Sequence, residues 1–239
     1  MTTLFGWGAM FGSVSPSPYV IKADVQMQML GLAFDRRIAD LASVPKGKAP
    51  YVEDDGAIIE DTFFIRQHFE AKLGVDLNAG LSDTDRAHAW AFERMLENHL
   101  AWFMVHERWV EGDNFERGPV HFFAGIPEPM RAEVVASMRE QVKNSIYGHG
   151  IGRHSRAERM QLAARDIAAT AALLDDKPFM LADHVTALDA AAYGVLACCA
   201  APIFESELPA MIAAHANLSA YLGRMQARFF AQDRWPPMV

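Results

Sequence analysis

Cysteine is almost absent from this chain. Only two cysteines occur among 239 residues, Cys198 and Cys199, and they are neighbours within an apolar run. Two adjacent residues cannot supply the long-range crosslinks that hold a small secreted domain together. The sequence therefore predicts two reduced thiols in the core of a cytoplasmic protein.

Long apolar runs and excess positive charge are lacking as well. The best membrane-span candidate, residues 187–203, is rich in alanine and contains Asp189 and Pro202, whereas a span needs about 20 predominantly apolar residues. The first five residues carry no basic flank of the kind found in a secretory signal. Lys and Arg total 22 against 30 acidic residues, a formal charge of −8. We therefore expect no membrane span and no nucleic-acid partner, because a phosphate backbone needs a positive surface.

Metal-binding motifs are also missing. The chain has nine histidines, among them His99 and His106 on one expected helix. No His-Glu-x-x-His motif and no spaced cysteine pair accompanies them. The sequence predicts no metal site.

What is present is a proline-led hairpin followed by a capped helix. Proline lacks an amide hydrogen, so Pro50 is expected at the start or edge of a strand, and we predict a cis peptide bond before it. Asp55-Gly56, between two apolar runs, predicts a tight hairpin turn. Asp61 or Thr62 can cap the helix that follows, whose positive N-terminal end suits an anionic group. An extended ligand could therefore pair with the backbone at Ala49 and place a carboxylate near Thr62.

This segment resembles the glutathione S-transferase superfamily. In chain order it contains Gly47-Lys48-Ala49-Pro50, Glu53-Asp54-Asp55-Gly56 and Asp61-Thr62. The corresponding motifs of the family are usually Gly-Lys-Val-Pro, Glu-Asp-Asp-Gly and Glu-Ser. Asp61-Thr62, in place of Glu-Ser, is a conservative departure. Any hairpin before a helix could show one of these motifs, but the three in this order are much more specific.

Further phrases are similar to one branch of that superfamily, the failed-axon-connection and metaxin-like proteins. They are Phe5-Gly6-Trp7-Gly8, Ser15-Pro16-Ser17-Pro18, Arg94-Met95-Leu96-Glu97 and the glycine-rich stretch from residue 147 to residue 155. The glycine-rich stretch also fits a corner between two helices with Arg153 or His154 supporting a helix end, which is the interpretation we favour.

The resemblance implies an α+β fold of two domains. A thioredoxin-like glutathione-binding domain is expected over residues 1–74 and an all-helical C-terminal domain over residues 82–239. The apolar patterns agree, because strand and helix signals alternate only in the first third of the chain. The elements expected there are strands at 4–7 and 33–38, a helix at 17–31, the hairpin and its helix. Beyond the linker at 74–80, helices are expected at about 82–110, 127–147 and 155–174, with a long loop at 111–126.

A capping box marks the second half of the chain. Thr186 and Asp189 stand three residues apart before a run that is apolar on all sides. This arrangement predicts a helix that begins at a side-chain cap and lies buried in the centre of the helical domain.

The resemblance assigns the chemistry to Ser17. A free thiol has a pKa of about 8.5, and a hydroxyl hydrogen bond together with a helix N-terminus lowers it. Ser17 could donate that bond to the sulfur of glutathione. Its spacing fits equally well with a plain N-cap, followed by Pro18 in the first helical position. Ser15 and Tyr19 are less favoured donors.

Glutathione, as co-substrate, is the ligand that the resemblance implies. Lys48 would neutralise the glycyl carboxylate, Ala49 would pair through its backbone beside Pro50, and Asp61 with Thr62 would hold the γ-glutamyl end. The simpler alternatives are a solvated loop lysine at position 48 and plain helix capping at positions 61 and 62.

The expected activity is transfer of glutathione to a small electrophile in a groove between the domains. The expected partners are that electrophile and a second copy of the chain. The competing interpretation is a non-catalytic interaction module, as in metaxin-like relatives. Large apolar residues on the first long helix could line the electrophile pocket or belong to the core; they are Trp90, Met95, Trp102, Phe103 and Met104.

Overall fold

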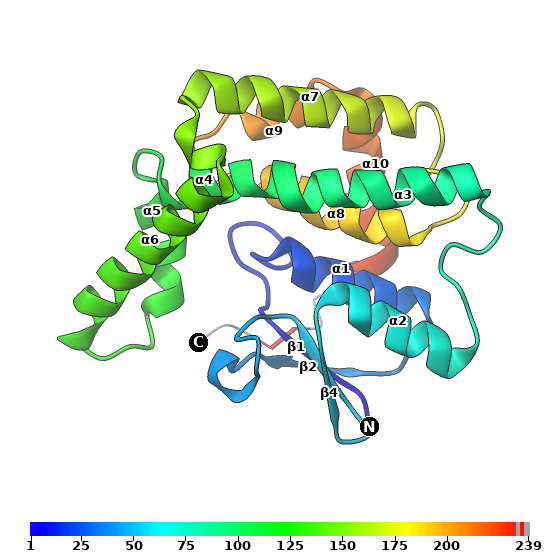
Figure 1. Cartoon of the computed structure of the whole chain (residues 1–239), viewed down its shortest axis with the longest axis horizontal. Helices are drawn as coiled ribbons and strands as arrows, with labels where there is room; N and C mark the ends of the chain where they lie inside the picture. Colours follow the sequence, from blue (N-terminus) through cyan, green and yellow to red (C-terminus); the bar gives the residue numbers. More distant parts are fainter. Residues whose placement is uncertain (233–234, 237–239) are drawn as a thin grey trace.

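The computed structural model describes residues 1–232 and 235–236. A four-stranded sheet carries two helices on one face, and a larger body of helices lies beyond them (Figure 1). Helix α1 (Pro18–Met29) lies between the sheet and this helical body. The predicted α+β fold, a thioredoxin-like unit followed by a helical one, is confirmed.

The N-terminal unit follows the predicted order of elements. They are β1 (Thr3–Gly6), α1, β2 (Asp35–Ile38), the short 3₁₀ helix η1 (Leu41–Ser43), β3 (Tyr51–Asp54), β4 (Ala57–Glu60) and α2 (Thr62–Leu73). The strands lie in the order β2-β1-β3-β4, with β1 parallel to β2 and both remaining pairs antiparallel. Two parallel strands need a crossover connection, and α1 supplies it.

The turn between β3 and β4 forms as the sequence predicts. Asp55 and Gly56 both have positive φ, 50° and 83°, as the favoured two-residue hairpin turn requires. Asp and Gly tolerate this backbone region better than other residues. The turn thereby sets a register in which Tyr51 lies opposite Glu60.

Helix α1 is buried on two sides and joins the two units. Its residues in the sheet core are Val20, Ala23 and Met27, and its residues in the helical core are Ile21 and Val25. Helix α8 (Ala187–Cys199) approaches it closely at Gly194, where a Cβ atom would lie 2.4 Å from the carbonyl oxygen of Pro18. Any side chain at position 194 would push the two helices apart.

The helical body begins with a long helical run that differs from the prediction. In place of one α-helix over 82–110, the structure has α3 (Asp83–Met95), a π-helical turn η2 (Leu96–Leu100) and α4 (Ala101–Trp109). Ser82 caps the run as expected, accepting a hydrogen bond from Asp85 N–H at 3.1 Å. π-helical turns have no sequence signature as clear as a cap, so hydrophobic periodicity alone could not reveal this one.

The expected loop at 111–126 is wrong in part. It contains α5 (Asn114–Arg117) and the 3₁₀ helix η3 (Pro119–Phe123). Phe115 and Phe123 are buried and both contact Trp109, with ring centroids 5.6 and 6.5 Å apart. Burial of these rings favours compact helical turns over an open loop. Together with α6 (Met130–His149), these short helices project from the helical body (Figure 1).

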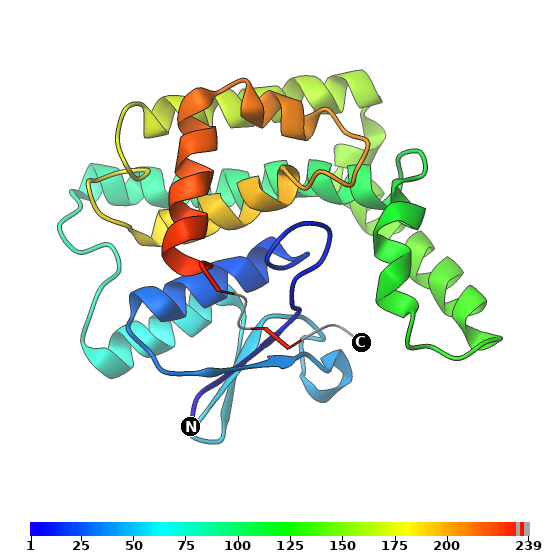
Figure 2. The same ribbon diagram turned by 180° about the vertical axis from the view of Figure 1, so that it is seen from behind.

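The remaining helices close the fold. They are η4 (Ile151–Arg153), α7 (Arg156–Leu174), α8, α9 (Leu208–Ala213) and α10 (Ala216–Phe229). The capping boxes of α7 and α8 are both present, and the predicted burial of α8 is confirmed. Beyond α10 the chain crosses towards the sheet (Figure 2).

Candidate functional site

Strands β1, β3 and β4 each start or stop at the same end of the sheet. We call this end, which is formed by strand termini and not by an outer strand, the sheet edge. Phe5, Tyr51 and Glu60 lie side by side in the registers of β1, β3 and β4. Adjacent strands are about 4.8 Å apart, so the residues just beyond this row, Pro50 and Asp61, are neighbours. The edge therefore brings the two predicted binding segments together, although they are eleven positions apart in the sequence.

The segment before β3 leaves its backbone available. The peptide bond between Ala49 and Pro50 is cis, as predicted. Pro50 is buried and Ala49 is half-buried. Within the part of the chain that the structure describes, the N–H and C=O of Ala49 have no hydrogen-bond partner. An extended ligand could therefore pair with them as an added strand does.

The segment after β4 begins helix α2. Asp61 is the N-cap: its Oδ1 accepts a hydrogen bond from Phe63 N–H at 3.0 Å, and its φ is 79°. Thr62 is the first helical residue and is buried, whereas Asp61 is exposed. Of the two caps that the sequence allowed, Asp61 is the one observed. The unpaired N–H groups of this first turn offer a site for a carboxylate.

Ser17 caps helix α1, as the sequence predicts. Its Oγ accepts a hydrogen bond from Val20 N–H at 3.4 Å, and the side chain is half-buried. Helix α1 runs back from the carboxyl end of β1, so its N-terminus faces the same edge of the sheet as Ala49 and Asp61. Because the cap uses an Oγ lone pair, the hydroxyl proton stays free to donate.

Of the two alternative donors, Ser15 is too buried to reach a ligand readily and the Tyr19 hydroxyl already donates elsewhere. Ser15 is buried and its Oγ accepts from Ser17 N–H at 3.3 Å. The hydroxyl of Tyr19 donates to the carbonyl of Glu97 in η2 at 3.1 Å. Burial, and then the nearby charge of Glu97, raise the pKa of Tyr19 well above its ordinary value. Neither group is as available to a ligand thiol as Ser17.

Lys48 is exposed on the loop that precedes β3. The N–H of the nearby Lys46 donates to Glu60 Oε1 at 2.8 Å, which ties this loop to the end of β4. Lys48 is thus carried next to the edge that holds Ala49 and Asp61. A role for it in binding a carboxylate remains a prediction.

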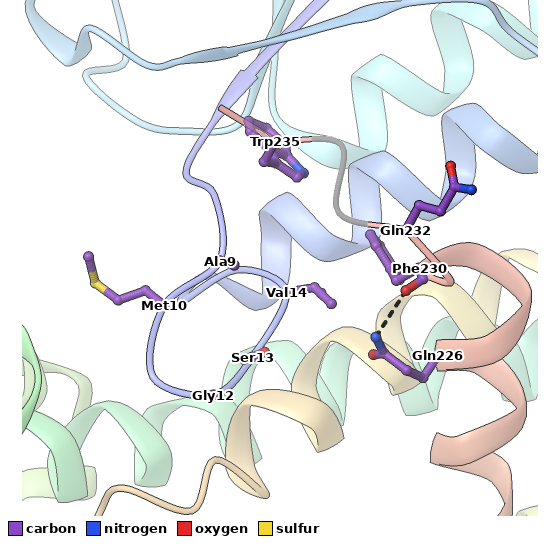
Figure 3. Close-up of a pocket in the computed structure, with 9 residues that line it drawn as sticks. All are labelled: Ala9, Met10, Gly12, Ser13, Val14, Gln226, Phe230, Gln232 and Trp235. Carbon is purple, nitrogen blue, oxygen red and sulfur yellow. Dashed lines mark hydrogen bonds between the residues drawn. The ribbon is translucent and has the colours of Figure 1, made fainter. Parts of the chain in front are cut away.

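A cavity of about 440 Å³ adjoins the loop that leads to Ser17 (Figure 3). One wall is formed by that loop, between Ala9 and Val14. The other is formed by residues from α10 and beyond, namely Gln226, Phe230, Gln232 and Trp235. These C-terminal residues carry no motif, so nothing in the sequence predicted that they would lie against the loop.

The apolar residues of the first long helical run do not line this cavity. Phe103 and Met104 are buried in the helical core. Trp90 lies on the surface with 52 % of it exposed, and its ring contacts Phe63 of α2 at a centroid distance of 5.7 Å. The buried residues of this set therefore belong to the core and do not line an electrophile pocket.

One cluster of potential metal ligands occurs among residues 1–232 and 235–236. It consists of His106, Glu107 and Glu111, whose ligand atoms lie within 4.8 Å of one another. Arg159 pairs with Glu111, and Arg156 lies 3.6 Å from a carboxylate oxygen of Glu107. Since both carboxylates already face guanidinium groups, the cluster forms an ion-pair network, and we assign no metal to it.

Comparison with known families agrees with this geometry. The family model of the glutathione S-transferase N-terminal domain matches residues 18–114, and that of the glutathione S-transferase C-terminal domain matches residues 163–225. An isoprene-epoxide glutathione S-transferase from Rhodococcus sp. (strain AD45) is 33 % identical over 82 % of this chain and 85 % of its own length. The chain belongs to the glutathione S-transferase superfamily.

Other relatives of this chain are more distant. Failed axon connections from Drosophila melanogaster is 28 % identical over 76 % of this chain and 46 % of its own length. Among solved structures, a β-etherase from Sphingobium sp. strain SYK-6 aligns with a TM-score of 0.69 at 14 % identity, covering 95 % of each chain. A glutathione S-transferase from Methylobacterium radiotolerans in complex with glutathione sulfonate aligns with a TM-score of 0.63 at 18 % identity, covering 100 % of this chain and 97 % of its own. At these identities the two structures bear on the fold alone.

Proposed function

We propose that this protein binds glutathione at the sheet edge and transfers it to a small electrophile. The observation that carries the proposal is the convergence of three features at that edge. They are the unpaired backbone of Ala49, the open N-terminus of α2 at Asp61, and the hydroxyl of Ser17 at the N-terminus of α1.

In this proposal the tripeptide lies along the edge as an extra strand. Ala49 pairs with its backbone, Asp61 and Thr62 hold the γ-glutamyl end, and Lys48 neutralises the glycyl carboxylate. Ser17 donates its hydroxyl proton to the sulfur. That hydrogen bond and the positive end of α1 both favour the thiolate over the thiol.

The electrophile occupies the cavity beside the Ala9–Val14 loop, which leads directly into Ser17. We propose an epoxide as the first class to test, because the Rhodococcus relative is named for one. The thiolate attacks an epoxide carbon, a carbon–sulfur bond forms as a carbon–oxygen bond breaks, and the resulting alkoxide takes a proton from solvent.

Calorimetric titration with glutathione, followed by assays with epoxides and other electrophiles, tests the proposal. We expect saturable binding and conjugate formation that depends on enzyme. The Asp61→Ala variant should bind glutathione at least about tenfold more weakly, since a charge-assisted contact contributes roughly 1.5–3 kcal/mol. The matched control is Asp55→Ala, an exposed aspartate in the hairpin turn away from the edge. Equal affinity of the wild type and Asp61→Ala would show that the binding site is misplaced.

The alternative is a non-catalytic interaction module. The printed name of the Drosophila relative, Failed axon connections, specifies no enzymatic activity, so this alternative is tested alongside the enzyme. No helix in residues 1–232 or 235–236 is both long enough and apolar enough to cross a bilayer. A wild-type protein that folds but does not bind glutathione would favour this alternative over the enzyme.

We also propose a homodimer in the cytoplasm. An aromatic cluster on α2 and α3, consisting of Phe63, Phe64 and Trp90, supports it: Phe64 and Trp90 are about half exposed, and Phe63 contacts both rings. Burial of these rings against a second copy would remove a continuous apolar area from water.

A further inference from the structure

Arg108 is a buried cation beside the loop that carries Ser17. Its side chain extends from α4 and the residue is 4 % exposed. Nη1 donates to the carbonyl oxygen of Pro16 at 2.8 Å, and Nη2 donates to the carbonyl oxygen of Cys198 at 2.5 Å. The guanidinium also lies over the ring of Phe204, 4.8 Å from its centroid.

No carboxylate balances this charge within the described part of the chain. The hydrogen-bond acceptors of Arg108 are two neutral carbonyls, and its Nε has no partner among the residues that the structure describes. The titratable groups that face it are the thiols of Cys198 and Cys199 on α8, and burial raises the pKa of both. They are therefore neutral near pH 7. The carbonyl of Cys198 belongs to the negative end of α8, which offsets only part of the cost of burying a full charge.

The contacts of Arg108 also hold the Ser17 loop against the helical body. The carbonyl that accepts from Nη1 belongs to the residue just before Ser17. The thiol of Cys198 donates to the carbonyl of Ser15 at 3.6 Å. Phe11 anchors the other end of the loop, in contact with Phe204 at a centroid distance of 5.2 Å. The position of the Ser17 hydroxyl thus depends on a side chain from the helical unit.

We propose that Arg108 is a positioning residue that sets the Ser17 turn and whose unbalanced charge favours the glutathione thiolate. This inference rests on the proposed function. A nearby opposite charge stabilises the ionised form of a thiol, and a buried cation is screened less by solvent than an exposed one. In this proposal the thiolate of bound glutathione supplies the negative charge that offsets Arg108.

The experiment measures the pKa of enzyme-bound glutathione from the ultraviolet absorbance of the thiolate as pH is varied. Arg108→Gln keeps a donor for the carbonyls and removes the charge, so the thiol pKa should rise by about one unit. Arg108→Lys keeps the charge and loses the two-pronged donor, so the thiol pKa should stay close to that of the wild type while kcat falls. Arg131→Gln is the matched control, because Arg131 also donates to two backbone carbonyls but lies on the projecting helix α6.

Each outcome decides a separate point. A wild type that does not bind glutathione overturns the proposed function and this inference with it. A wild type that binds, with Arg108→Gln folded and its bound thiol pKa unchanged, overturns the role of Arg108 alone. If Arg108→Gln does not fold, Arg108→Lys still decides: a thiol pKa raised by a full unit despite the retained charge contradicts the inference.

Discussion

At the scale of single residues, the candidate site depends on groups that still have a free hydrogen-bond donor or acceptor. Ser17 accepts from a helix N–H, keeps its proton and is only half-buried, whereas Ser15 is fully buried and the Tyr19 hydroxyl donates to a backbone carbonyl. Ala49 contributes backbone rather than a side chain. Access to a free donor or acceptor, more than residue type, distinguishes the candidate site residues from their neighbours.

Ser17→Ala should slow conjugation near neutral pH while glutathione affinity changes much less. Loss of one preorganised donor costs roughly 10²-fold in kcat, and the rising limb of the pH–rate profile should move to higher pH because the bound thiol ionises less readily. Stopped-flow or steady-state profiles would measure this. The lost cap costs about 0.5–2 kcal/mol of stability, so folding is checked first, with Ser15→Ala and Tyr19→Phe as comparisons. If one of those two moves the profile and Ser17→Ala does not, the activating residue is another one.

At the scale of elements, caps and turns define the framework. Asp189 is fully buried; its Oδ2 accepts from Thr186 N–H at 2.8 Å and its Oδ1 accepts from Met180 N–H at 2.9 Å. One carboxylate thus joins the start of α8 to the segment before it. In the sheet, Asp54 plays a similar part between the hairpin and α2.

Thr186→Ala should lower the free energy of unfolding by roughly 0.5–2 kcal/mol with little direct effect on glutathione affinity. The lost group is the hydroxyl 3.0 Å from Asp189 Oδ2, in a fully buried site. Urea denaturation compared with Thr186→Ser, which keeps the hydroxyl, isolates this contribution. A midpoint identical to the wild type would mean that the hydroxyl does not stabilise the start of α8.

Asp54 should make stability depend on acid pH. Burial would raise the pKa of this carboxyl, but hydrogen bonds from His68, Lys72 and Thr2 outweigh it and hold the pKa well below its usual value. A lowered native pKa adds stability above the unfolded-state pKa of about 3.9, and that stability is lost as pH falls below it.

The check is thermal unfolding of Asp54→Asn across pH. Near pH 7 the variant should be less stable by about 1.5 kcal/mol, at the low end for bonds to a charged group since Lys72 is partly exposed. The difference should shrink below pH 4. Asp55→Asn, at an exposed neighbour, should show a smaller effect; a difference for Asp54→Asn that stays constant with pH would contradict the linkage.

At the scale of the whole molecule, the two units are joined by α1 and by the contacts of its preceding loop. Buried Lys22 of α1 pairs with Glu93 and Glu97 of the helical body at 3.0 and 2.6 Å. The sheet edge supplies the proposed glutathione site, and the ends of the chain supply the cavity. We therefore expect loss of the inter-unit contacts to disturb catalysis before it disturbs the fold of either unit.

The aromatic cluster on α2 and α3 gives the prediction at this scale. Trp90→Glu should convert a homodimer into a monomer, because a charge would be buried at the interface. Light scattering after size exclusion measures the mass. Met130→Glu on α6, at another exposed apolar site, should leave the mass unchanged. A wild type that runs as a monomer, or a Trp90→Glu protein that stays dimeric, contradicts the assignment.

The sequence by itself determined the features that depend on interactions within a few residues. The Asp55-Gly56 turn, the Ser17 and Ser82 caps and the Thr186–Asp189 box depend on backbone conformations and hydrogen bonds within a few residues, so short motifs reveal them. The proline before β3 and the ordered motifs around it also indicated the family. The choice between Asp61 and Thr62 as cap, in contrast, depended on the residue at which α2 begins, which the motif left open by one position.

Only the tertiary structure decided the features that depend on packing between residues far apart in the sequence. The π-helical turn η2 contacts Tyr19 of α1 through the carbonyl of Glu97, α5 contacts Glu205 through Asn114, and the cavity walls join the Ala9–Val14 loop to residues from 226 onwards. Such contacts between distant segments carry no local signal. Arg108 looks like one more charge on a helix in the sequence. The fold buries it beside Pro16 with no paired carboxylate among residues 1–232 and 235–236, because burial and pairing are properties of the packed molecule.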